Sequence, residues 1–390
     1  MDGGCLAIDA MTAGLMSAGA QVKVLTASTR KHPLILESLD PEYIEQTDLE
    51  GVDLETGLDV RDAFIALMNG ASYNISRFYS HQYAMVLKKI LSRQRYDVVH
   101  LESLYTTPYI ETIRNHAPTA LIALRSHNHE FQIWEQRWKA SRNPIHRLIL
   151  RHLTKVLERY EKSVMLDLDA IVAISSGEGK GYRNWGYEGP VHVAGFGIPV
   201  SKATAKPERT VPRAEKGIRL FHLGAMDWAP NREGVDWFIQ NVWPHILQAH
   251  PKTEFHIAGR GLSKEDWAGT AGVMNHGEVE DADAFTREHD MLVVPLLRGA
   301  GIRVKIVEAL SRGVPVATTD VGLHGLELTD ESCVIKASPD AFADALIEVL
   351  AEPAQLVRLS GSGYAAAMDG FDRDKIGLEL LDFYSQHVKI

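Results

Sequence analysis

Short segments rich in apolar residues recur along the chain and predict strands, and the run 291–296 has no polar alternation, which is typical of a strand buried on both faces of a parallel sheet. Between them, apolar residues repeat with the period of an amphipathic helix. The runs typical of strands are 22–26, 96–101, 120–124, 169–175, 219–224, 253–258, 291–296 and 316–318. The segments with helical periodicity are 6–18, 145–166, 234–248, 302–312, 342–351, 356–368 and 374–387. This alternation predicts an α/β protein with helices covering parallel sheets.

The alternation of strands and helices starts again after residue 217, which predicts two domains. Residues 200–216 hold two prolines and many charges with little periodicity, so we interpret them as a linker. The N-terminal domain is then 1–199, the C-terminal domain is 217–370, and 371–390 form a last helix. A length of 390 residues with 45% hydrophobic content suits two domains with separate cores.

Charge and composition narrow the class of protein. A net charge of −10 argues against a general nucleic-acid binder. The two cysteines, Cys5 and Cys333, lack metal-ligand spacing and favour a reduced, cytoplasmic protein. No apolar run approaches the roughly 18 residues that span a bilayer, and there is no secretory signal. The basic stretch 137–162 suggests peripheral contact with the inner face of the membrane, although a solvated helix face has the same pattern.

Residues 290–326 carry the most informative pattern. An apolar strand leads into Gly299-Ala300-Gly301, then a helix and a second apolar strand, which is a βαβ unit. Glycines before a helix allow backbone N–H groups to approach an anion. Arg303 and Lys305 fall in the predicted first turn, where the helix dipole disfavours each cation by about 0.3–1 kcal/mol. A bound anion would reverse this cost; the alternative is a surface ion pair between Lys305 and Glu308.

The segment resembles the donor-site signature of glycosyltransferase family 4, also called glycosyltransferase group 1. Its members are retaining enzymes with the GT-B fold, in which two Rossmann-like parallel-sheet domains face a central cleft. The usual signature is Glu, seven residues, then Glu-Ala. Glu308-Ala309 matches the second half, while the first Glu would fall at Ala300, as in a subgroup that lacks it. The resemblance implies that Glu308 accepts hydrogen bonds from the donor ribose, and that Gly299, Gly301 and Ile302 belong to the donor loop.

Residues 223–231 resemble the loop after the first strand of the donor domain, which places Gly224 and Asn231 at the donor. Family members carry an Arg where this chain has Ala225, and a Lys further on that is missing here. We therefore expect Arg303 and Lys305 to neutralise the diphosphate, whose negative charge grows as it leaves. The alternative for 227–231 is a turn that caps the next helix.

Three further segments resemble the family. The segment 276–279 resembles the one that lines the nucleotide base, with Val279 as the candidate contact. The alternative is an ordinary strand end, which has the same pattern. Gly3-Gly4 resembles the glycine turn beneath the donor, which makes Gly4 a candidate. His127 follows an apolar strand, where open α/β sheets bind ligands. It matches a histidine near the transferred sugar, although a lone histidine is more often structural.

The resemblance implies an enzyme that moves a sugar from a nucleotide sugar, UDP- or GDP-linked, to an acceptor hydroxyl of a glycan, a lipid-linked glycan or a small molecule. Configuration is retained, by front-face attack in which donor phosphate helps to remove the acceptor proton. We expect no metal and no other cofactor, because cationic side chains replace the metal and no Asp-x-Asp motif follows a strand. The alternatives are a sugar-nucleotide hydrolase or epimerase, and a non-catalytic subunit that binds a nucleotide sugar.

The start of the chain raises a separate expectation. In the family the first domain opens with a strand before its glycine turn, and this chain begins at the turn. The opening strand lies near the centre of such a sheet. Strands 22–26 and 96–101 would therefore flank an unfilled position unless another segment occupies it. We expect a natural start about 15–20 residues upstream, the length of a strand with its flanks, and a C-terminal helix that crosses back to the first domain.

Overall fold

The computed structural model describes residues 3–57, 72–199, 217–299, 301–335 and 338–388. The chain divides into two compact units. The N-terminal unit comprises residues 2–195 and 374–390, and the C-terminal unit comprises residues 196–373. The predicted linker, 200–216, lies outside the described residues. Among the helices that are described, none combines the length and the apolar character needed to cross a bilayer.

The C-terminal unit is built on a parallel sheet with the strand order β12-β11-β10-β7-β8-β9. Its strands are β7 (Arg219–Leu223), β8 (Glu254–Ala258), β9 (Val273–Gly277), β10 (Met291–Val294), β11 (Val316–Thr318) and β12 (Val334–Ile335). From β7 the chain adds β8 and β9 on one side and then returns to add β10 on the other. The neighbours β7 and β10 therefore form the topological switch point of a doubly wound sheet, where such folds bind ligands.

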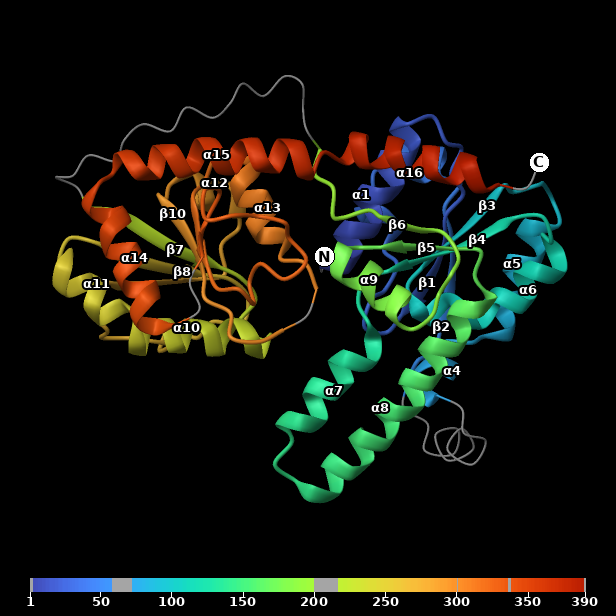
Figure 1. Ribbon diagram of the computed structural model, residues 1–390, viewed down its shortest axis with the longest axis horizontal. Coiled ribbons are helices and arrows are strands. Elements are labelled where there is room, and N and C mark those ends of the chain that lie inside the picture. Colours follow the sequence, from blue (N-terminus) through green and yellow to red (C-terminus); the bar gives the residue numbers. More distant parts are fainter. Residues whose placement is uncertain (1–2, 58–71, 200–216, 300, 336–337, 389–390) are drawn as a thin grey trace. The chain divides into compact units, whose positions relative to one another are not determined.

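Helices cover both faces of this sheet (Figure 1). On one face lie α10 (Ala229–Asn241), α11 (Trp243–Ala249) and α14 (Pro339–Ala351). On the other lie α12 (Ala282–Arg287), α13 (Val304–Ser311) and α15 (Ala354–Gly370). Alternate strand residues point to opposite layers, as strand geometry requires. Leu220 packs with Phe238 in the core on the first face, whereas Phe221 contacts Phe285 of α12 on the second.

The N-terminal unit contains two parallel sheets. The larger has the order β3-β4-β5-β6, and the smaller pairs β1 with β2. Their strands are β1 (Leu25–Thr29), β2 (Glu50–Leu54), β3 (Val98–Glu102), β4 (Leu121–Ser126), β5 (Ala170–Ala173) and β6 (Val191–Val193). No strand within the described residues pairs with both β1 and β3. The unfilled position between these strands stays a prediction.

Helices from both ends of the chain pack on the larger sheet. The α-helices of this unit within the described residues are α1 (Gly3–Ser17), α2 (Pro41–Gln46), α4 (Tyr73–Ser76), α5 (His81–Leu91), α6 (Ile110–His116), α7 (Glu130–Ala140), α8 (Pro144–Val164), α9 (Ser176–Asn184) and α16 (Arg373–His387). Met11 and Leu15 of α1 share a buried core with Leu121 of β4 and with Leu380 and Tyr384 of α16. The last helix thereby covers part of the sheet that the first half of the chain builds.

The structure corrects several predicted boundaries. Gly3 and Gly4 form the first turn of α1, so the prediction of a glycine turn before the helix is wrong. The helix predicted at 234–248 is two helices that meet at Val242, because Pro244 lacks the N–H that a continuous helix needs there. The helix predicted from 302 begins at Val304, and Arg303 precedes it with φ −90° and ψ 81°. The strand predicted at 22–26 begins at Leu25.

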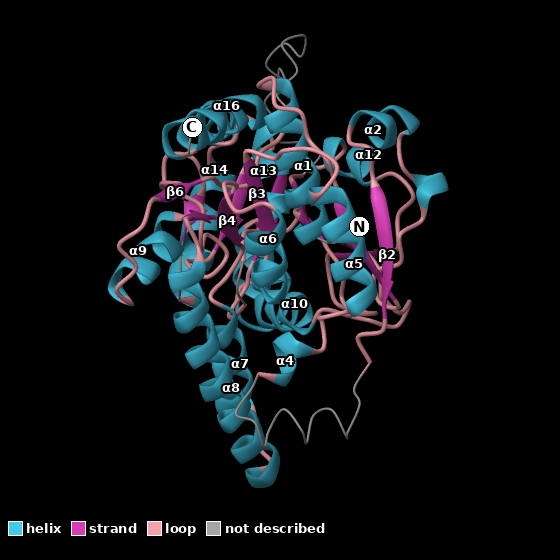
Figure 2. Ribbon diagram, turned by 90° about the vertical axis from the view of Figure 1, so that its right-hand side faces the viewer, coloured by secondary structure: helices cyan, strands magenta, loops and turns pink. Residues whose placement is uncertain are grey.

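The hairpin of α7 and α8 extends away from the sheet of the N-terminal unit, and its two helices lie side by side (Figures 1 and 2). Asn143 caps α8 by accepting hydrogen bonds from the backbone N–H groups of Ile145 and His146. Glu161 of α8 caps α7, because its carboxylate accepts the N–H groups of Glu130 and Phe131, both at 3.2 Å. The hairpin is thus fixed at its base by polar contacts.

Replacing Gly377 by alanine should destabilise the N-terminal unit. Gly377 of α16 lies against the backbone of Gly14 in α1, and an added Cβ would overlap its carbonyl group. Overpacking of this kind costs about 1–3 kcal/mol, which urea unfolding measures. The matched control is Gly370→Ala, since a Cβ at Gly370 meets open space. Equal stability of the two variants would show that α1 and α16 do not pack this closely.

Candidate donor site and a second polar cluster

The carboxyl ends of β7 and β10 meet at the switch point of the C-terminal unit. Gly224 follows β7, and residues 295–299 and 301–303 follow β10. The chain then enters α10 and α13, whose N-termini carry unpaired N–H groups and the positive end of the helix dipole. Two such helix ends next to the same pair of strands favour a bound anion.

Lys305 of α13 reaches across to the loop after β7. Its Nζ donates to Oδ1 of Asn231 at 3.2 Å, and Nδ2 of Asn231 donates to the carbonyl of Ala225 at 2.9 Å. A side chain at Gly224 would collide with Lys305 Nζ and approach Asn231, so glycine leaves the room that the lysine occupies. No ion pair joins Lys305 to Glu308, so the surface-pair alternative is wrong.

The surroundings of Lys305 lower the pKa of its amino group. Burial, and then the charge of Arg303, lower the pKa of Lys305 to about 7. Arg303 is itself buried, and burial lowers its pKa to about 10. Its guanidinium lies 5.3 Å from the centre of the Trp228 ring and donates to the carbonyl of Gly301 at 2.9 Å. Two adjacent cations at the positive end of a helix repel each other, and a bound anion would relieve that repulsion.

His222 is a part of this site that the sequence analysis missed. It is fully buried near the end of β7, and its Nδ1 donates to the carbonyl of Val293 at 2.7 Å. Its Nε2 is directed toward the position that a side chain at Gly224 would fill. Burial, followed by the charge of Lys305, keeps the pKa of His222 well below its usual value, so the ring is neutral. A histidine between the apolar residues Phe221 and Leu223 of β7, two positions before Gly224, was the available signal.

The other predicted donor residues are distributed around the switch point. Gly299 and Gly301 have φ values of +131° and +85°, which disfavour side chains, and a Cβ at Gly299 would approach Arg303. Ile302 is half-buried beside them. Val279 lies two residues beyond β9, away from the β7–β10 neighbours, and Gly4 belongs to the other unit. The roles of these residues in binding remain predictions.

Glu308 lies three residues after Lys305 on α13 and is half-buried. Burial raises the pKa of its carboxyl group, while Arg312 has the opposite effect. Arg312 forms an ion pair with Asp283 at 2.6 Å and acts on Glu308 only through its charge. Residues 227–231 do not cap α10 with a side chain either, because Trp228 takes the N-cap position and Asp227 pairs with Arg260.

A second polar cluster lies at the carboxyl ends of β3 and β4 in the N-terminal unit. Nε2 of His127 is 2.9 Å from Oε2 of Glu102, and Nε2 of His100 is 3.2 Å from the other carboxylate oxygen. Arg125 is fully buried beneath them, 3.9 Å from Glu102. Burial alone would raise the pKa of Glu102, but Arg125 and then His100 outweigh it, so the carboxyl group stays ionised.

This cluster explains the position of His127. The carboxylate of Glu102 accepts a hydrogen bond from Nε2–H of His127, which leaves Nδ1 as the ring nitrogen that can accept a hydrogen bond. His127 is therefore neither isolated nor a buried core histidine. The sequence analysis missed Glu102, although a carboxylate that ends an apolar strand beside His100 was a usable signal.

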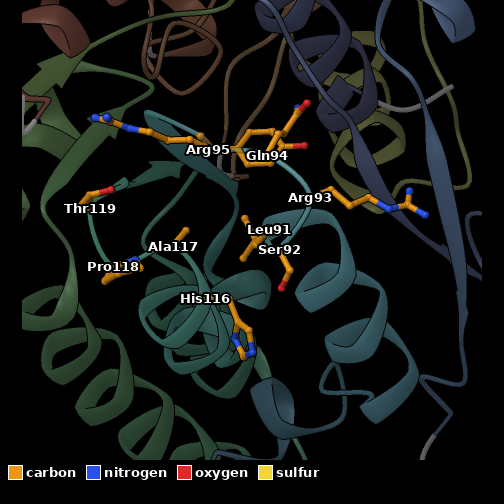
Figure 3. Close-up of a pocket in the computed structure, with 10 residues that line it drawn as sticks. Leu91, Ser92, Arg93, Gln94, Arg95, His116, Ala117, Pro118 and Thr119 are labelled. Atoms are coloured by element: carbon orange, nitrogen blue, oxygen red, sulfur yellow. The ribbon is translucent and has the colours of Figure 1, made fainter.

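The N-terminal unit also has a surface hollow of about 330 Å³, lined by residues 91–96 and 116–119 (Figure 3). These residues precede β3 and β4, so the hollow lies at the amino ends of the strands. Open α/β sheets bind their ligands at the carboxyl ends. The hollow therefore does not coincide with either polar cluster.

Comparison with known proteins agrees with this architecture. Residues 217–352 match the domain family described as "Glycosyl transferases group 1". The phosphatidyl-myo-inositol mannosyltransferase of Mycobacterium leprae is 26% identical over 198 residues, which are 48% of this chain and 51% of the relative. The matched domain thus contains β7, Gly224, Lys305 and Glu308.

Solved structures resemble the chain over nearly its whole length. Sucrose-phosphate synthase from Thermosynechococcus elongatus superposes with a TM-score of 0.64 at 17% identity, covering 97% of this chain and 92% of that one. An Escherichia coli trehalose-6-phosphate protein bound with UDP-2-fluoro glucose gives 0.62 at 12% identity, covering 97% and 96%. The chain has the α/β GT-B fold with two Rossmann-like domains, and its residues 217–352 are similar to the group 1 glycosyltransferase domain.

The pKa of Lys305 predicts how binding of a nucleoside diphosphate depends on pH. A bound diphosphate favours the protonated lysine, so above pH 7 binding must take up a proton that the free protein has lost. Affinity for UDP or GDP, measured by calorimetry, should therefore fall between pH 7 and 9, by at most tenfold per pH unit.

Two substitutions at Lys305 test whether the fall in affinity between pH 7 and 9 comes from this lysine or from another group. Lys305→Arg keeps a cation at every pH and should bind without the decline. Lys305→Met should bind more weakly and also without it. The same decline in Lys305→Met as in the unaltered protein would remove Lys305 from the diphosphate site.

Proposed function

We propose that this protein transfers a sugar from a nucleotide-sugar donor to an acceptor hydroxyl with retention of anomeric configuration. The observation that carries the proposal is Lys305, which lies at the switch point and pairs with no carboxylate among the described residues. The match of 217–352 to the group 1 domain and the GT-B neighbours support nucleotide-sugar glycosyl transfer as the general activity. The UDP sugar bound by one neighbour makes a UDP-linked donor the first choice, with GDP as the alternative.

In the proposed reaction, the bond between the sugar C1 and the diphosphate oxygen breaks while the acceptor oxygen bonds to C1 from the same face. The acceptor proton passes to the departing diphosphate. Lys305 and Arg303 stabilise the charge on that leaving group, and the N-terminus of α13 adds its dipole. Glu308 binds the donor ribose. No metal is required in this scheme, because the cations occupy its place.

We assign the acceptor side of the reaction to the second polar cluster. His127 is oriented by Glu102, which is held ionised by Arg125 and His100. A histidine with a fixed proton position can bind a sugar hydroxyl or stabilise charge on the sugar. Glycans, lipid-linked glycans and small molecules with hydroxyl groups all fit this chemistry.

A lipid-linked acceptor is favoured by the end of the α7–α8 hairpin. The side chains of Ile145, Leu148 and Ile149 are 72%, 68% and 52% exposed. A cluster of large exposed apolar side chains is typical of a surface that binds a protein or a membrane. The guanidinium groups of Arg147 and Arg151 lie 5.4 and 5.8 Å from the Trp138 ring. Apolar residues beside cations and an aromatic ring are typical of helices that lie in a membrane interface. We therefore propose a peripheral contact with an anionic membrane surface, with the enzyme on its cytoplasmic side.

Product analysis tests the transferase proposal and its alternatives. Release of UDP or GDP from a panel of sugar nucleotides should require an acceptor, and the product should keep the donor's anomeric configuration. In Glu308→Gln, kcat/KM should fall by about 10- to 150-fold, the equivalent of the 1.5–3 kcal/mol that a hydrogen bond to a charged group contributes.

Three outcomes would contradict the proposal. Nucleotide release without an acceptor indicates a hydrolase, and binding without turnover indicates a non-catalytic subunit. Undiminished turnover in Glu308→Gln would exclude that carboxylate from the donor site.

Cosedimentation with lipid vesicles tests the membrane contact. The protein should bind vesicles of phosphatidylcholine with 30% phosphatidylglycerol, and bind less as salt is raised, because salt screens the attraction of cations to anionic lipid. The variant with Leu148→Ser and Ile149→Ser should lose most of this binding. The control is Leu378→Ser, which removes a 58% exposed apolar side chain from α16 of the same unit. Equal binding by both variants would show that the hairpin is not the membrane contact.

A further inference from the structure

Three histidines from separate elements meet on the α12 face of the C-terminal sheet. His256 lies on β8, His276 on β9, and His289 just after α12. One ligand atom from each ring lies within 4.8 Å of the other two. His256 and His289 are 8% and 3% exposed, whereas His276 is open to solvent. The sequence separations of 20 and 13 residues form no recognisable motif, so only the fold brings these rings together.

Hydrogen bonds at the outer edge of the cluster decide which ring nitrogens face inward. Oε2 of Glu254 lies 3.2 Å from Nε2 of His256, and the carbonyl of Phe285 lies 2.6 Å from Nδ1 of His289. Each oxygen is an acceptor, so it fixes a proton on the nitrogen that it contacts. Nδ1 of His256 then carries a lone pair, and it lies 2.9 Å from Nε2 of His276. Metal-bound histidines typically donate their other N–H to a carboxylate or a backbone carbonyl, as here.

We propose that His256, His276 and His289 form a zinc site whose fourth position is open to water. Zinc–nitrogen bonds of 2.0–2.1 Å in tetrahedral geometry place ligand nitrogens about 3.4 Å apart. Nδ1 of His256 and Nε2 of His276 are 2.9 Å apart, and all three ligand nitrogens lie within 4.8 Å of one another. The ideal spacing falls between these two values, so small side-chain rotations would bring the nitrogens into tetrahedral positions. Imidazole ligands suit zinc and its transition-metal neighbours rather than magnesium or calcium.

The electrostatic surroundings keep the ligands available. Burial favours the uncharged form of both buried rings, which lowers the pKa of His256 and lowers that of His289 to about 4. The charge of Arg219 acts on both rings and opposes a cation. The carboxylate of Glu254 acts in the other direction and contacts His256 directly. The exposed ring of His276 gives the ion access from solvent.

A zinc ion here would connect β8, β9 and the turn that leads into β10. His276 directly precedes Gly277, where the chain leaves β9 with a φ of +68° toward Val279. The ion would therefore restrict the loop that the sequence analysis assigned to the nucleotide base. This zinc site lies outside the set of Lys305, Arg303 and Glu308, and its existence does not depend on the proposed reaction.

Zinc binding to chelator-treated protein tests the site. In competition with a chromophoric chelator, the protein should bind one equivalent of Zn²⁺, and its melting temperature should rise as Zn²⁺ is added. His276→Ala should lower the affinity at least 100-fold, and because the side chain is exposed, circular dichroism should show an unchanged fold. The matched control is His245→Ala, which removes another exposed histidine of the same unit and should bind zinc like the unaltered protein.

Two further measurements concern the geometry. Co²⁺ in place of Zn²⁺ should give the intense visible bands of a tetrahedral nitrogen site, and these should be absent in His276→Ala. Glu254→Gln should weaken Zn²⁺ binding about 10- to 100-fold, as loss of an orienting carboxylate does elsewhere. Equal zinc affinity and stoichiometry in His276→Ala and His245→Ala, or octahedral Co²⁺ spectra, would overturn the proposal.

Discussion

The charge at the switch point of the C-terminal unit depends on one half-buried lysine. This lysine pairs with no carboxylate among the described residues. Lys305 lies at the positive end of α13, its pKa is lowered by burial and by Arg303, and its direct contact is the amide oxygen of Asn231. Such an arrangement costs stability in the empty protein and becomes favourable when an anion arrives. Gly224 has no side chain, so the space beside the lysine stays free of protein atoms from that position. His222 is neutral, so it adds no charge next to the lysine.

In the N-terminal unit the buried cation is neutralised by the protein itself. Arg125 is fully buried, and its cost is offset within the unit by Glu102 and by a hydrogen bond to the carbonyl of Gly195. Glu102 in turn holds His127 at the edge of the sheet. The C-terminal unit therefore presents a positive charge to a ligand, whereas the N-terminal unit presents an oriented and internally balanced histidine. This contrast fits the proposal of a phosphate-bearing donor at the C-terminal unit and an acceptor hydroxyl at the N-terminal unit.

Burial gives the histidines of this chain different chemistry. His222 is neutral and belongs to the switch point, while His256 and His289 are neutral and face a third, exposed ring. His127 instead contacts an ionised carboxylate. The same side chain therefore takes three distinct roles, and the neighbours that separate them come from strands and helices far apart in sequence.

The sequence by itself determined the α/β class and the positions of most strands, because unbroken apolar runs such as 316–318 can be satisfied only inside a covered parallel sheet. It also marked the glycine loop before α13 and the cations at the start of that helix, since glycines and charges at a helix start have local physical meaning. It could not place the start of α13 after Arg303 or the break at Val242, because helix ends depend on local competition between backbone and side-chain contacts. The contact of Lys305 with Asn231, the pairing of Glu102 with His127, and the meeting of His256, His276 and His289 were decided only by tertiary structure. Each joins residues 13 to 74 positions apart, which become neighbours only when the order of parallel strands brings their ends and faces together.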